Sequence, residues 1–122
     1  MQHVRIVNVT RGTVLAESGE VARSFFARGR GLMGRESLPA GYALVIYPEW
    51  SIHMFFMRVP IDVLFVSRDH RVVGLRSSLP PWHPGAGVAP WRGRYVVEMP
   101  AGVIAASGTA QGDQIAITPP LF

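Results

Sequence analysis

Apolar and polar residues alternate in short stretches along most of the chain, which is the pattern of β-strands with one buried face. The β-branched residues between Val4 and Val9 predict the first strand, and Thr10-Arg11-Gly12 predicts the turn that ends it. Similar stretches lie between Pro, Gly and charged turn residues. They predict further strands over residues 13–16, 42–47, 51–57, 61–66, 71–75, 95–99 and 114–118.

Helical spacing replaces this alternation in one long segment. Ser18 as N-cap and Glu20 in the first turn predict a helix whose apolar residues recur over residues 21–33, as one helix or as two short ones because glycines interrupt it. A second short helix is predicted over residues 100–106. The fold class is therefore α+β and mostly β: one domain over residues 1–122, with a small curved or barrel-like antiparallel or mixed sheet and one or two short helices.

The segment over residues 79–93 contains four Pro and three Gly, and this composition predicts a long loop without regular structure. It carries Trp82 and Trp91, two large apolar side chains. Two interpretations stay open. The tryptophans are either a docking surface for a partner or a lid over an open end of the barrel.

The sequence has 122 residues and no Cys, which excludes disulfides, thiolate metal sites and a cysteine nucleophile. Its formal net charge is +4, but the 12 basic residues, all Arg, are scattered and form no nucleic-acid-binding motif. No His pair has metal-ligand spacing, so we expect no metal and no cofactor. No apolar stretch approaches the roughly 20 residues of a membrane span. The first residues do not resemble a signal peptide, which favours a cytoplasmic location and leaves an exported one open.

Several segments in this order and spacing together resemble domain-of-unknown-function family 192, a prokaryotic family, over residues 13–118. The segments are Arg30-Gly31-Leu32-Met33-Gly34-Arg35, Ile52-His53-Met54-Phe55-Phe56-Met57, Pro60-Ile61-Asp62-Val63-Leu64-Phe65-Val66, Val96-Val97-Glu98-Met99-Pro100-Ala101-Gly102 and Gly112-Asp113. The resemblance implies a compact, mostly β domain in small proteins, some with export signals, and no established reaction. Members usually carry Thr or another small polar residue where this chain has Met54, so a ligand contact from that hydroxyl would be missing here.

Polar side chains inside apolar strands are the candidates for chemistry. His53 could act as a general base or a hydrogen-bond donor, or could be satisfied by a backbone carbonyl. Strand alternation places His53 and Phe55 on one face. Asp62 and Glu98 each interrupt an apolar strand and need a partner if they are buried, either as structural Arg–carboxylate pairs or as part of a binding site.

The glycine-rich stretch between Arg30 and Arg35 has two possible roles. It could hold an anion, or Leu32 could plug the core while the two arginines pair with Glu36 or Glu98. For Glu98, the candidate partners are Arg30, Arg35 and Arg58.

The leading hypothesis is a binding module for a small molecule or a peptide, with a pocket near His53. The residues predicted to form it are Arg30, Arg35, His53, Phe55, Asp62, Trp82, Trp91 and Glu98. The alternative is a hydrolase or lyase in which His53 is a general base oriented by Asp62 or Glu98, without a covalent nucleophile, since no serine has the required context. A third possibility is an interaction protein that uses the tryptophan-bearing loop.

Overall fold

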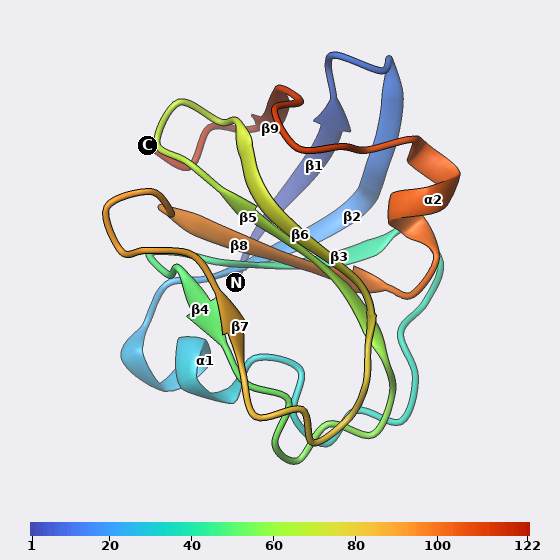
Figure 1. Ribbon diagram of the computed structural model, residues 1–122, viewed down its shortest axis with the longest axis vertical. Coiled ribbons are helices and arrows are strands. Elements are labelled where there is room, and N and C mark those ends of the chain that lie inside the picture. Colours follow the sequence, from blue (N-terminus) through green and yellow to red (C-terminus); the bar gives the residue numbers. More distant parts are fainter.

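The computed structural model describes residues 1–122, and a seven-stranded mixed sheet forms its centre (Figure 1). The strands of this sheet are β1 (Gln2–Asn8), β2 (Thr13–Ala22), β3 (Tyr42–Ile46), β5 (Ile61–Val66), β6 (Val72–Leu79), β8 (Tyr95–Pro100) and β9 (Ile115–Thr118). Two very short strands, β4 (Ser51–Ile52) and β7 (Ala86–Gly87), form a separate ribbon. The helices are α1 (Phe25–Arg30) and α2 (Val103–Ser107), and neither is long enough to cross a membrane.

The sheet order is β6-β5-β8-β3-β2-β1-β9, and every neighbouring pair is antiparallel except β2 and β3. The sheet curls until its two edge strands approach each other at one corner. There the Val72 N–H donates to the Asp113 carbonyl at 2.9 Å, and the Ile115 N–H donates to the His70 carbonyl at 2.8 Å. The result is a half-barrel, which confirms the predicted curved, mostly β fold class.

Each face of the sheet has its own apolar cluster because side chains alternate along a strand. Along β8, Val97 and Met99 belong to the cluster shared with β1, β9 and α2, whereas Val96 belongs to the cluster covered by the segment after α1. In Figure 1, α1 and the β4–β7 ribbon lie together, while α2 lies at the far end of the sheet. The two faces of the sheet are therefore covered by different parts of the chain.

The prediction of a helix beginning at Ser18 is wrong. Residues 18–22 continue β2 and pair in parallel with β3, from Ser18 opposite Tyr42 to Ala22 opposite Ile46. The long-range pairing with β3 overrides the local helical spacing. The helix begins later, where the Ser24 hydroxyl caps it by accepting from the Ala27 N–H at 3.0 Å.

The predicted strand over residues 51–57 ends at Ile52, and the next residues turn. The backbone of Met54 pairs with the long loop: its N–H donates to the His83 carbonyl at 2.9 Å, and its carbonyl accepts from the Trp82 N–H at 2.7 Å. Met54 is buried and Phe55 is exposed. The long loop itself is irregular apart from β7, and α2 begins at Val103, three residues later than predicted.

Candidate functional site

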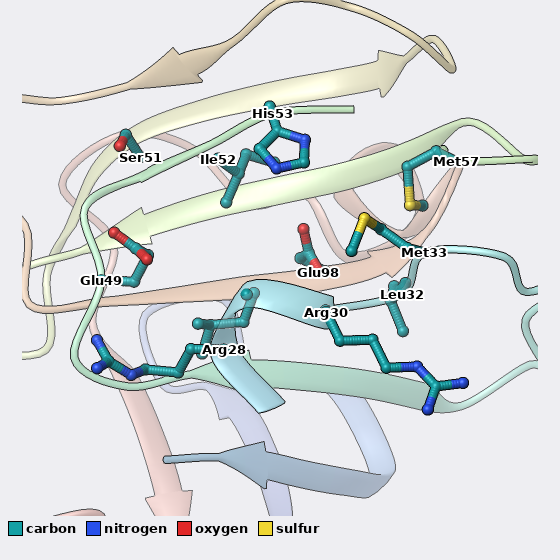
Figure 2. Close-up of a pocket in the computed structure, with 13 residues that line it drawn as sticks. Arg28, Arg30, Leu32, Met33, Glu49, Ser51, Ile52, His53, Met57 and Glu98 are labelled. Atoms are coloured by element: carbon teal, nitrogen blue, oxygen red, sulfur yellow. The ribbon is translucent and has the colours of Figure 1, made fainter. Parts of the chain in front are cut away.

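A pocket of about 110 Å³ opens beside α1 on the face of the sheet covered by the segment after α1 (Figure 2). One wall is formed by residues 28–33, the end of α1 and the turn after it. The opposite wall is formed by the segment that carries Glu49 and His53, and Glu98 of β8 lies at the bottom. A cavity of this size holds a group of only a few heavy atoms.

Glu98 is 4% exposed and lies opposite Leu44 of β3 and Val63 of β5 in the sheet register. Its Oε1 atom is buried and has no hydrogen-bond partner. Burial, and to a smaller extent the negative charge of Glu49, together raise the pKa of Glu98 to about 8. Glu98 is therefore mostly protonated at neutral pH.

None of the predicted arginine partners reaches Glu98. Arg35 lies 3.9 Å from Glu20 and over the ring of Tyr42, and Arg58 pairs with Glu36 at 3.0 Å. Arg30 lines the pocket, but Figure 2 shows its guanidinium turned away from Glu98. The expectation of an Arg–Glu98 pair is therefore corrected, because Arg35 and Arg58 lie beside other glutamates and the guanidinium of Arg30 points away from Glu98.

Two further residues line the pocket beside Glu98. Gly31, the C-cap of α1, has φ +50, and a Cβ built on it would lie 3.4 Å from Glu98 Oε1. Arg28 donates from Nη1 to the Pro48 carbonyl at 3.0 Å, while its buried Nε has no partner. Across the structure, Arg28 Nε and Glu98 Oε1 are the two buried side-chain polar atoms without a partner, although such atoms are almost always paired in folded proteins.

His53 lies at the mouth of the pocket. Its Nδ1 accepts from the Phe55 N–H at 3.2 Å, so the neutral ring carries its proton on Nε2. Figure 2 shows the ring directed into the pocket, with the Glu98 carboxyl directed toward it from the opposite side. The structure thus brings three of the candidate residues, His53, Glu98 and Arg30, to one pocket.

An exposed group of rings adjoins His53, and we call it the aromatic rim: Phe55, Phe56 and Trp82. The ring centroids lie 5.2 Å apart for His53 and Phe55, 6.2 Å for Phe55 and Trp82, and 5.0 Å for Phe56 and Trp82. Neither tryptophan lines the pocket as a lid. Trp82 packs in this rim, and Trp91 is 86% exposed and does not line the pocket.

Asp62 lies elsewhere, because it points to the other face of the sheet. It is 1% exposed, and its carboxylate accepts from three backbone N–H groups. The distances are 2.8 Å from Ser78, 3.1 Å from Gly102 and 2.8 Å from Ile104. These bonds hold β6 and the start of α2 to β5. Because Asp62 lies on the other face of the sheet, no His53–Asp62 pair forms.

Sequence reasoning missed Arg28, Glu49 and Ser51 as lining residues. No local pattern marks them, because they come together only when the turn after β3 folds over α1. No group of three or more His, Cys, Asp or Glu is arranged to hold a metal ion.

The protein is therefore a curled, mixed-sheet half-barrel with a small polar pocket beside its first helix. The chain belongs to domain-of-unknown-function family 192, described as an uncharacterised ACR family, which it matches over residues 6–117. A UPF0127 protein from Thermococcus sibiricus is 38% identical over 119 residues, 90% of this chain and 72% of the relative. A UPF0127 protein from Pyrococcus furiosus is 33% identical over 115 residues, covering 90% of this chain and 95% of the relative.

The fold is also found in a crystal structure. A protein of unknown function from Novosphingobium aromaticivorans superposes with a TM-score of 0.80 at 24% sequence identity, covering 93% of this chain and 83% of that one. At this identity the similarity shows the fold alone.

Proposed function

We propose that this protein is a small-molecule binding module whose ligand completes the hydrogen bonding of Glu98. The single observation that carries the proposal is the buried, unpartnered Oε1 atom of Glu98 at the bottom of the pocket. A buried polar atom without a partner lowers stability, and a ligand that supplies the partner restores that free energy as affinity. Gly31 leaves open the space beside this oxygen that a side chain would occupy.

The small volume limits what enters the pocket. The group bound next to Glu98 has a few heavy atoms, and the rest of the ligand lies at the mouth, beside His53 and the aromatic rim. A folded macromolecule would insert only one side chain here. We therefore place a small molecule before a peptide, and we propose no specific nucleic-acid recognition.

The experiment is native mass spectrometry of the purified full chain, followed by NMR titration with acetamide, methylammonium and acetate. We expect chemical-shift changes at Gly31, His53 and Glu98 with at least one probe. The same probe should cause none in Glu98→Leu, which fills the bottom of the pocket with an apolar side chain. If no probe shifts these resonances and no co-purified molecule is found, the binding proposal fails.

Acid–base catalysis is the second candidate, because a carboxyl that stays protonated at neutral pH faces an imidazole across the pocket. In that reading Glu98 donates a proton and His53 accepts one, in a hydrolase or a lyase. A screen of esters, phosphoesters and glycosides tests it. A turnover that persists in both His53→Ala and Glu98→Gln would remove the enzyme reading.

A further inference from the structure

We propose that the group held at Glu98 is a primary ammonium, the cationic end of a larger molecule. This inference rests on the proposed function and names the chemical class of its ligand. An ammonium group donates several hydrogen bonds and carries a positive charge. It therefore supplies the hydrogen-bond donor that Oε1 of Glu98 lacks, together with a positive charge that the nearby carboxyl groups attract.

The charges around Glu98 favour a cation. Glu49 lines the same pocket, and its negative charge disfavours ionisation of Glu98. The positive groups that line the pocket are Arg28, Arg30 and, when protonated, His53. Arg28 is tied to the Pro48 carbonyl and Arg30 is turned away, and neither is among the causes that shift the pKa of Glu98.

The neighbouring strands add no charge to the bottom of the pocket. Leu44 of β3 and Val63 of β5 lie directly opposite Glu98, and Ile46 lines the pocket from β3. Glu49 is the charged group that shifts the pKa of Glu98. An anion would meet two carboxyl groups there, whereas an ammonium bound to ionised Glu98 removes their repulsion.

The aromatic rim offers a place for the rest of the molecule. Phe56 and Trp82 have φ values of +64 and +66, a conformation that costs bulky residues free energy and that recurs at functional sites. The backbone bonds between Met54 and the long loop hold this segment in place. Trp82 is thus kept on the surface against Phe55, and Phe55 stacks on His53 at the pocket mouth. An apolar body attached to the ammonium can pack against Phe55 there.

Binding of an ammonium should be coupled to the release of a proton from Glu98, and this coupling tests the ammonium assignment. Methylammonium binds the ionised form of Glu98, so a carboxyl that is protonated in the empty pocket must release its proton when the cation enters. With a pKa of about 8 in the free protein, the affinity should rise about fifty-fold between about pH 6 and pH 8. A neutral amide requires no proton release, and its affinity should not rise over that interval.

The experiment is calorimetric titration of the full chain with methylammonium chloride, acetamide and sodium acetate at both pH values. We expect methylammonium to bind tightest at the higher pH and to release a proton, detected by comparing buffers of different ionisation enthalpy. Glu98→Gln should abolish this binding, and Glu49→Gln should weaken it several-fold. Glu17→Gln removes an exposed acid that pairs with Arg5 and should change nothing.

A second titration separates the ammonium end from the body of the molecule. Phenethylammonium should bind more tightly than methylammonium, because its ring reaches the aromatic rim. Phe55→Ala, which removes the ring that stacks on His53, should abolish most of that difference, so that the two ammonium ions bind with similar affinity.

The outcomes that contradict the inference differ from those that contradict the binding module. If acetamide or acetate binds more tightly than methylammonium and needs Glu98, the pocket is a binding site but the ammonium assignment is overturned. Methylammonium binding that survives in Glu98→Gln also overturns it. If none of the three probes binds at either pH, both proposals fail.

Discussion

Asp62 and Glu98 are two buried carboxyl groups on neighbouring strands of one sheet, and their surroundings are opposite. Asp62 lies opposite Met99, and Glu98 lies opposite Val63, so alternation points the two side chains to different faces. Asp62 accepts three backbone hydrogen bonds, whereas Glu98 keeps an unpartnered oxygen in a pocket. A carboxyl whose bonds are complete within the protein is part of the architecture, and one whose bonds are incomplete is available to a ligand.

The largest expected effect is the loss of Asp62. Asp62→Ala leaves three backbone N–H groups without their acceptor, and we expect it to lower the free energy of unfolding by about 4 kcal/mol. Asp62→Asn keeps one acceptor oxygen and should cost less. Urea unfolding followed by tryptophan fluorescence measures both changes. A loss below about 1 kcal/mol in the alanine variant would show that the three hydrogen bonds of Asp62 contribute little to the stability of the fold.

For Glu98 we expect the opposite effect: replacing this carboxyl group should raise the free energy of unfolding. Its pKa is raised to about 8 in the folded protein, above its ordinary value, so the native protein retains a proton that the unfolded chain releases. Stability should therefore fall as the pH rises from about 4.5 to 8. Glu98→Gln should lack this loss and exceed the native protein in stability by about 4 kcal/mol at pH 8. Unfolding curves across this pH range test it, and parallel profiles for the two proteins would contradict it.

Asp113 is a third buried carboxyl group, and its pKa is shifted in the opposite direction to that of Glu98. Hydrogen bonds from Arg11 and Asn8 lower its pKa to about 2, so its contribution is complete above its ordinary pKa near 4 and is lost as the pH falls through 2. Asp113→Asn should destabilise the protein at neutral pH by about 2 kcal/mol, and the difference should shrink on acidification. Acid unfolding monitored by circular dichroism measures this. An unchanged difference at about pH 2 would disprove the linkage.

The smallest effect is expected at Gly31. Gly31→Ala places a Cβ near Glu98 Oε1 and forces an alanine to φ +50, with an expected cost of about 1 kcal/mol. Gly112→Ala is the matched control, because its φ is +93 and no atom lies within 4 Å of the added Cβ. Both should lose similar stability, but only Gly31→Ala should weaken methylammonium binding. Equal binding in the two variants would argue against a ligand beside Gly31.

The fold class was predictable because strands such as residues 61–66 and 95–99 are marked by apolar, β-branched residues between clear turn signals. The region around Ser18 was not, since its helical spacing lost to pairing with β3. The turn at His53–Met57 was missed for a related reason: its backbone partners lie in the long loop some 30 residues away in sequence.

Of the candidate site, His53, Arg30 and Glu98 were identified by their residue types within apolar or glycine-rich segments. The pattern of residues along the chain is sufficient to predict a mostly β domain and to mark the polar residues that interrupt its apolar strands. Which of these residues share a pocket depends on the folded chain, because the pairing of β8 with β3 and β5 fixes the face on which Glu98 lies and the face on which Asp62 finds its hydrogen-bond donors. Register and long-range hydrogen bonding are properties of the folded chain, and no local stretch of residues encodes them.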